Sequence, residues 1–120
     1  MRMWMADPKF LCQKHLCGEH LECHMFLGTM KKGKKITGYL KNNLFEPESL
    51  KIRHDALADE MVRREYNHKT PLSSCDFENC VNTLNAGFRE VKIDRNDSFN
   101  DLINRCPECK SRYEDLKNER

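Results

Sequence analysis

The stretch KHLCGEHLECHMFLGTMKK, from Lys14 to Lys32, decides the class of fold. Apolar residues in and just before it recur at the spacing of one helix face, at Cys12, Leu16, Cys23, Phe26, Leu27 and Met30. Gly33 follows directly, and glycine is common just after the last residue of a helix. The stretch therefore predicts a long amphipathic helix and, with it, a mainly α-helical protein.

Two further segments carry helix signals. Residues 47–66 open with a proline, which suits the first turn of a helix, and continue with apolar residues at helical spacing. Residues 98–116 open with Ser98 and Asp101, which resemble a capping box, and Pro107 either kinks this helix or divides it. We expect the second and third helices in these segments.

The segments between these helices, residues 38–45 and 70–95, lack sustained periodicity, so we expect long connecting loops there. A chain of 120 residues is long enough for one modest core and too short for two. We therefore predict a mainly α, compact single domain over residues 1–120, built of about three helices joined by long connecting loops.

The composition favours a folded protein that does not enter a membrane. Hydrophobic residues make up 38% of the chain and recur steadily along it, which argues against disorder. No apolar run approaches the roughly 20 residues that cross a bilayer, and Asp7, Pro8 and Lys9 leave no room for a signal-peptide core. Seven cysteines in such a chain favour reduced thiols. We expect a cytoplasmic monomer.

The basic residues are unevenly distributed, although the formal net charge of +2 is too small to indicate nucleic-acid binding by itself. The densest group is the turn KKGKK, which contains Lys31, Lys32, Lys34 and Lys35 around Gly33. Further basic residues follow at Arg53, Arg63, Arg64 and Lys69. These positions indicate a basic surface, and the alternative is a lysine-rich turn that is merely solvated.

One face of the first helix carries groups that titrate. His15, Glu19 and Glu22 stand at i, i+4 and i+7, which places them on the same side of a helix. Carboxylates on a helix usually form a solvated face. A carboxylate pair beside a histidine can also move protons once burial or charge shifts the pKa values, so this face is a candidate for acid–base chemistry.

Histidines and cysteines offer several possible metal ligands. His20 and His24 stand at i and i+4, but the metalloprotease pattern needs a glutamate where this chain has Leu21. The pairs Cys12-x-x-His15 and Cys17-x-x-His20 overlap on one helix and point in different directions.

Cys106 and Cys109 form a C-x-x-C pair, for which Cys75 and Cys80 are the candidate partners in a four-cysteine zinc site. The alternatives are cysteines that contact the core and a redox-sensitive pair. We assign no residue to a metal.

The string LCQKHLCGEHLECHMFLG, from Leu11 to Gly28, is followed by the lysine-rich turn and by YNHKTPL. This pattern resembles the pyrimidine-dimer DNA glycosylases, the phage-type endonuclease V family, from Met1 to about Leu72. The RCPEC near the end of the chain resembles bacterial members. The resemblance implies a compact, mainly helical domain that binds double-stranded damaged DNA, kinks it and displaces a nucleotide from the stack.

The resemblance also implies a mechanism. Members of the family attack C1′ of the sugar with the α-amine of the first residue, form an imine, release the base and break the strand by β-elimination. A glutamate on the first helix is indispensable, and the motif places it on Glu22 and the motif histidine on His15. Counting back without a gap places the nucleophile on Met1 and the following arginine on Arg2. Because Arg2 is large, we expect Met1 to be retained and its amine to react.

An α-amino group suits this role, since it titrates near pH 7.7 to 8.0, about two to three units below lysine. The expected DNA contacts are Arg2, His15, Lys31, Lys32, Lys34, Lys35, Arg64 and Lys69. Trp4 either stacks on a base or anchors the start of the chain in the core.

Two positions depart from the family pattern: Leu21 and Met25 stand where the family commonly has arginine, so other lesions and plain abasic sites become alternative substrates. We predict a DNA repair glycosylase with abasic-site lyase activity that uses no cofactor. The alternatives are a non-catalytic nucleic-acid-binding module, stabilised by zinc at the four cysteines named above, and a helical metalloenzyme that uses His20 and His24.

Overall fold

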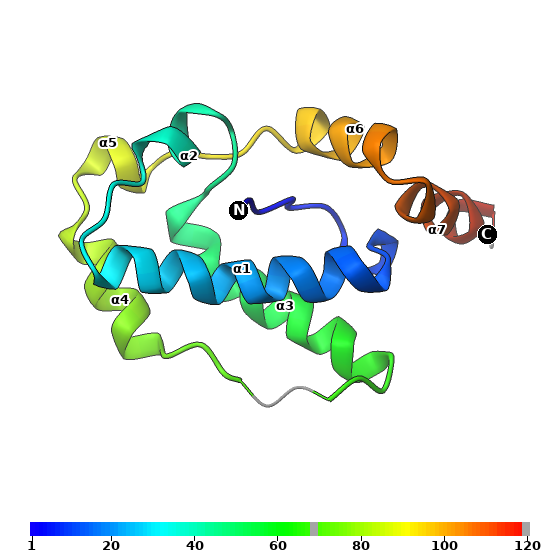
Figure 1. The fold of residues 1–120 in the computed structure, drawn as a ribbon, viewed down its shortest axis with the longest axis horizontal. Helices are drawn as coiled ribbons and strands as arrows, with labels where there is room; N and C mark the ends of the chain where they lie inside the picture. The colour runs from blue at the N-terminus through cyan, green and yellow to red at the C-terminus, as the bar shows by residue number, and fades with distance from the viewer. Residues whose placement is uncertain (68–69, 119–120) are drawn as a thin grey trace.

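Two long helices form the centre of the protein, as the computed structural model shows for residues 1–67 and 70–118. Helix α1 (Gln13–Lys31) packs across α3 (Leu50–Arg63) over much of its length (Figure 1). Leu16 and Phe26 of α1 and Leu57 of α3 have no exposed surface, so burial of apolar area stabilises the packed helices. The lysine turn ends α1, where Gly33 adopts a φ of 67° that favours glycine.

The other elements surround this pair. They are two 3₁₀ turns, η1 (Pro8–Phe10) and η2 (Pro47–Ser49), and the helices α2 (Thr37–Lys41), α4 (Ser74–Thr83), α5 (Ala86–Arg89), α6 (Arg95–Arg105) and α7 (Pro107–Asn118). The prediction of a mainly α fold is confirmed, with 70% helix and no strand in the part of the chain that is described. No helix in that part has the length and apolar content needed to cross a bilayer.

The prediction of about three helices is wrong, because the described residues form seven. The segments expected to be loops contain α2, α4 and α5. The helices α2 and α5 are too short to show a helical period, α4 has only ten residues, and side-chain caps mark where α4 and α5 start. The hydroxyl of Ser73 accepts the N–H of Asp76 before α4, and the side chain of Asn85 accepts the N–H of Phe88 before α5.

The predicted third helix is divided at Pro107 into α6 and α7, one of the two outcomes expected from the sequence. Proline lacks an amide hydrogen, which costs nothing in the first turn of a new helix. The start of α6 was predicted wrongly, since Asp94, and not Ser98, caps it by accepting the N–H of Asp97. The second predicted helix is preceded by the turn η2 and ends at Arg63, slightly before residue 66.

The first seven residues run through the middle of the fold, beside α1 and below α2 and α6 in Figure 1. Met3 has no exposed surface, and its N–H donates to the carbonyl of Leu44 at 2.7 Å. The hydroxyl of Ser98 in α6 donates to the carbonyl of Trp4 at 2.5 Å. These contacts fix the start of the chain between helices that are far apart in the sequence.

Candidate active site

A cleft of about 1050 Å³ opens beside the first half of α1. Its walls come from four places: the N-terminal residues Met1, Arg2 and Trp4, the polar face of α1, the loop at residues 42–44, and α6. His15, Glu19 and Glu22 all line it, so the helical spacing correctly placed them on one face. The cleft therefore joins the start of the chain to the groups that sequence analysis singled out.

Met1 and Glu22 line the same cleft. The backbone N–H of Arg2 donates to Glu22 Oε2 at 3.5 Å. Burial raises the pKa of Glu22 above its ordinary value, and the N–H of Arg2 and the positive amino group of Met1 offset part of this increase. The amine and the carboxylate are thus close enough to interact electrostatically, and the nearby Glu19 carboxylate favours the neutral form of Glu22 further.

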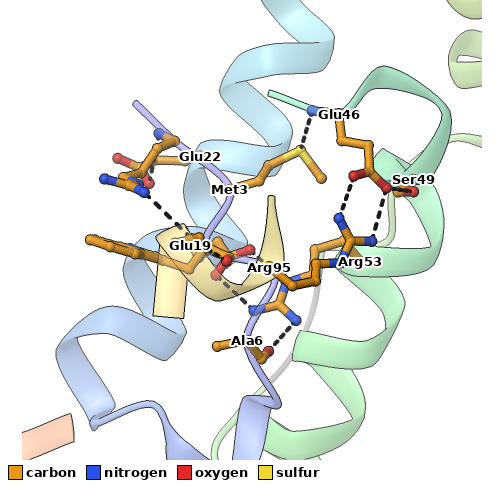
Figure 2. Close-up of polar contacts among 11 residues, drawn as sticks. Met3, Ala6, Glu19, Glu22, Glu46, Ser49, Arg53 and Arg95 are labelled. Atoms are coloured by element: carbon orange, nitrogen blue, oxygen red, sulfur yellow. Dashed lines mark hydrogen bonds and ion pairs between the residues drawn. The ribbon is translucent and has the colours of Figure 1, made fainter. Parts of the chain in front are cut away.

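Glu19 lies one turn before Glu22 but is almost fully buried, at 1% exposed. The guanidinium of Arg53 in α3 donates to both of its oxygens, from Nε at 2.5 Å and from Nη2 at 2.9 Å. The same guanidinium donates from Nη1 to the carbonyl of Ala6 at 2.6 Å (Figure 2). Glu19 therefore ties α1 to α3 and, through Arg53, to the N-terminal segment.

Arg2 joins the N-terminal segment to α6. Its guanidinium carbon lies 3.7 Å from the centre of the Trp4 ring, a cation–π geometry. Nη1 donates to Asp101 at 2.7 Å and Nη2 donates to the hydroxyl of Ser98 at 3.4 Å. Trp4 itself is 7% exposed, which favours the interpretation of this residue as a buried anchor.

Sequence analysis missed the contribution of α6. Polar side chains on one side of this helix line the cleft, at Asp97, Asn100, Asp101, Asn104 and Arg105. Their spacing of three and four residues is the signal that identifies them as one face. The wall is mixed in charge, since Arg105 pairs with Asp101 at 2.8 Å.

His15 lies where the cleft meets a group of cysteines. Its ring packs edge to face on Trp4, with centroids 5.6 Å apart. Its Nδ1 lies 3.2 Å from the Sγ of Cys12 and 3.6 Å from that of Cys109. Burial lowers the pKa of His15, the positive charge of Lys14 lowers it further, and the Glu19 and Glu108 carboxylates offset only part of this decrease, so the neutral ring is favoured.

The four cysteines considered as a possible zinc site do not lie together. Cys106 and Cys109 lie together, but their neighbours are Cys12 and His15, not Cys75 and Cys80. Cys75 and Cys80 belong to α4, which lies at the opposite end of the molecule from α7 in Figure 1.

A second group contains His20, His24 and His54, whose ring nitrogens lie within 4.8 Å of one another. Nε2 of His24 and Nε2 of His54 are 3.1 Å apart, and each also lies close to the carbonyl of Thr70, at 3.0 and 3.1 Å. None of these histidines is among the described residues that line the cleft. The structure thus adds His54 to the histidine pair noted in the sequence.

The lysine turn lies at the far end of α1 from the cleft. Lys32, Lys34 and Lys35 are exposed, and Lys31 pairs with Asp76 at 3.0 Å. None of the four is among the described residues that line the cleft. Any contact they make with DNA is therefore remote from Glu22.

Arg64 is held inside the protein. Its side chain is 8% exposed, and its guanidinium donates to Glu60 at 2.7 Å and to the carbonyls of Pro8 and Leu11 at 3.0 and 2.8 Å. These contacts give it a structural role and do not support the predicted contact with DNA. Lys69, also expected at the DNA, lies outside the described residues.

The fold and the cleft define a class: a small helical protein in which an amine and a half-buried carboxylate share one cleft, the groups needed for covalent catalysis through an amine. The family model described as pyrimidine dimer DNA glycosylase matches residues 1–74, more than half of the chain, and the protein belongs to this family. Comparisons with curated proteins and with solved structures gave no match. Membership confirms the resemblance seen in the sequence and implies a DNA glycosylase that acts on DNA.

Proposed function

We propose that this protein removes damaged bases from double-stranded DNA and cleaves the strand at the resulting abasic site, with the amino group of Met1 as nucleophile and Glu22 as the acid–base group. The observation that carries the proposal is the shared cleft: Met1 and Glu22 both line it, and the Met1 amine contributes to the pKa of Glu22. Family membership supports the substrate class.

The steps follow from the chemistry of an amine at C1′. The nitrogen forms a bond to C1′ as the bond from C1′ to the base breaks, and the base leaves with a proton. The sugar ring then opens to a protonated imine, a proton leaves C2′, and the 3′ phosphate departs by β-elimination. Water finally hydrolyses the imine and returns the amine.

Glu22 is suited to the proton transfers in this scheme. Burial favours its neutral form, which donates a proton, and the nearby positive charges of the amine and Arg2 favour the ionised form, which accepts one. The ionised form also stabilises positive charge that develops at the sugar. Glu19 is a poor candidate because Arg53 occupies both of its oxygens.

The preferred lesion depends on residues that depart from the family pattern. Leu21 and Met25, which stand where arginine is common, are 59% and 46% exposed on α1. Apolar side chains at these positions supply no charge for phosphates around a dimer. Displacing a nucleotide costs a few kcal/mol, and less at a damaged or unpaired site. We therefore place abasic sites and weakly paired lesions beside pyrimidine dimers as substrates.

Borohydride trapping tests the proposal. Duplexes that carry a dimer, a uracil, an oxidised base or an abasic site are incubated with the protein, and borohydride reduces any imine to a stable amine. We expect a covalent adduct, and peptide mass spectrometry should locate it on the Met1 nitrogen. A variant with extra residues before Met1 should give none.

Two results would overturn the proposal. One is an adduct on a lysine side chain, and the other is activity in a protein whose first residue has been removed. A tight complex with DNA that gives no adduct would identify a binding module without catalysis.

A further inference from the structure

Four potential metal ligands from opposite ends of the chain converge beside the cleft. Cys12 and His15 come from the start of α1, and Cys106 and Cys109 come from the junction of α6 with α7. Their ligand atoms all lie within 4.8 Å of one another. The three cysteines are at most 8% exposed, whereas His15 is partly exposed at the wall of the cleft.

The spacing of these atoms matches a tetrahedral zinc site. Zinc bonds of about 2.3 Å to sulfur and about 2.0 to 2.1 Å to nitrogen place two sulfurs about 3.8 Å apart, and a sulfur and a nitrogen about 3.5 Å apart. The Sγ atoms of Cys12 and Cys106 are 3.8 Å apart. The Nδ1 of His15 lies 3.6 Å from the Sγ of Cys109 and 3.2 Å from that of Cys12.

The backbone around the cluster is arranged as it is around thiolates bound to a metal. The N–H of Cys12 points at the Sγ of Cys109 at 3.2 Å, and the N–H of Cys109 points at the Sγ of Cys106 at 3.4 Å. Such N–H groups stabilise the negative charge that zinc-bound sulfur carries. Cys12 and Cys106 each stand directly before the first residue of a helix, where the helix dipole also favours an anion.

From this geometry we propose that Cys12, His15, Cys106 and Cys109 bind one zinc ion with a structural role. All four positions of the tetrahedron are filled by side chains, which is typical of a structural site and leaves no place for substrate. The spacings Cys12-x-x-His15 and Cys106-x-x-Cys109 are those in which one helix start or turn supplies two ligands. The site is distinct from Met1 and Glu22, and its test does not depend on catalysis.

Zinc at this position would fasten the part of the chain that the family match does not include. Cys12 and His15 fall within residues 1–74, and the other two ligands fall beyond them. The ion would hold the α6–α7 junction against the start of α1. Since α6 carries Ser98 and Asp101, which hold Arg2, the same ion would set the position of one wall of the cleft.

The metal content of the full-length protein tests this proposal. The protein would be produced with added zinc, purified under reducing conditions without chelator, and analysed by mass spectrometry for elements. We expect the wild type to hold one more zinc per chain than Cys109→Ser. Cys75→Ser is the matched control, because Cys75 is exposed on α4, and it should hold as much zinc as the wild type. His24→Gln should also keep this zinc, which excludes the histidine group as its source.

Cys109 has no exposed surface, so its variant can fail to fold. The zinc site must therefore also be measured directly in the wild type. X-ray absorption at the zinc edge should show three sulfur neighbours at about 2.3 Å and one nitrogen at about 2.0 to 2.1 Å. Exchange with Co²⁺ should give the intense visible bands of a tetrahedral site and charge-transfer bands from thiolate. Chelation should lower the Tm of the wild type, because binding energy at a structural site contributes to folding.

The proposal is overturned if the wild type holds no zinc and gives no thiolate bands with Co²⁺. It is equally overturned if the zinc neighbours are nitrogen and oxygen alone, or if Cys75→Ser loses as much zinc as Cys109→Ser. A disulfide between Cys106 and Cys109 in freshly purified reduced protein would also exclude it.

Discussion

Glu19 and Glu22 lie one turn apart on α1 and line the same cleft, yet their surroundings give them different properties. Glu19 is bound by both branches of the Arg53 guanidinium in a buried pair. Glu22 is half-buried and accepts a long hydrogen bond from the backbone N–H of Arg2. Removing one partner of a buried ion pair greatly lowers the free energy of unfolding. A carboxylate with a raised pKa is instead suited to proton transfer.

Substituting each glutamate in turn should separate the catalytic role of Glu22 from the stabilising role of Glu19. Glu22→Gln should slow borohydride trapping on abasic DNA by about 10²- to 10⁴-fold, the usual contribution of an acid–base group. It should leave the free energy of unfolding at pH 7 unchanged or slightly higher, because burial disfavours the charged carboxylate.

The matched control is Glu19→Gln on the same helix. It should lower the free energy of unfolding by about 3 to 5 kcal/mol, since Arg53 would stay buried with its charge unpaired. Single-turnover trapping and urea denaturation measure the two effects. If Glu22→Gln were trapped at the wild-type rate, or if both substitutions lowered the free energy of unfolding equally, the assignment of catalysis to Glu22 and of stability to Glu19 would be contradicted.

The raised pKa of Glu22 also predicts the acid side of the pH profile. Protonation of the α-amine lowers the rate as the pH falls below about 8, and if the ionised carboxylate accepts the proton in the slow step, the rate falls a second time as the pH drops through the Glu22 pKa. Because burial raises that pKa, the second fall should be centred above the ordinary glutamate value of 4.5. A carbon NMR titration of labelled glutamate carboxyls, with Glu22→Gln to assign the signal, measures the same pKa independently. A second fall centred at or below the ordinary glutamate value would exclude Glu22 as the group that causes it.

At the scale of elements, one buried carboxylate attaches α6 to the rest of the fold. Glu46, at 1% exposed, accepts hydrogen bonds from Arg95 Nη1 at 2.5 Å and from the N–H of Ile93 at 2.8 Å. The hydroxyl of Ser49 in η2 donates to its other oxygen (Figure 2). Glu46 therefore joins the turn before α3 to the start of α6.

This attachment should be sensitive to acid. Burial alone would raise the pKa of Glu46, but hydrogen bonds from Arg95, Ser49 and Ile93 prevail and lower it to about 2. A carboxyl whose pKa is lower in the folded state stabilises the fold above its ordinary value of 4.5, and this stability is lost as the pH falls toward about 2.

Glu46→Gln should therefore reduce the free energy of unfolding at pH 7 by about 1 to 3 kcal/mol. The difference between variant and wild type should shrink as the pH falls from 4.5 toward 2. Urea denaturation at several pH values checks this, with Glu48→Gln as the control, because Glu48 is exposed and its ion pair with Lys92 is long, at 3.6 Å. A difference that stays constant with pH would mean that the charge of Glu46 is not what matters.

The elements that could be predicted from sequence are those with a long periodic pattern, such as α1 and α3. The helices α2 and α5 have five and four residues, too few to show a repeat of about 3.6. The face with His15, Glu19 and Glu22 was predictable because helical geometry alone fixes it. The contact of His15 with Cys109 was not, since it joins residues 94 positions apart through the packing of α7 against η1.

At the scale of the whole molecule, the two expected DNA-binding features are separated along α1. The cleft lies beside the first half of this helix, and the lysine turn begins at its last residue, Lys31. Nineteen residues of helix span about 28 Å, close to the length of eight base pairs at about 3.4 Å each. A duplex lying along α1 can therefore place a damaged nucleotide at the cleft while its phosphates, several base pairs away, reach the lysines.

This arrangement predicts that the lysine turn contributes affinity without contributing to the chemical step. Each phosphate contact adds about 0.9 to the slope of log K against log salt, so Lys34→Gln with Lys35→Gln should reduce the slope by up to about 1.8. Fluorescence anisotropy with a duplex containing a stable abasic analogue, at several salt concentrations, measures this slope. Trapping at saturating DNA should be unchanged.

The matched control is Lys110→Gln with Lys117→Gln, the same change in charge on α7, which lies at the opposite end of the molecule (Figure 1). If both pairs of substitutions reduced the slope equally, the protein would be using its overall charge, and the duplex would have no fixed direction along α1.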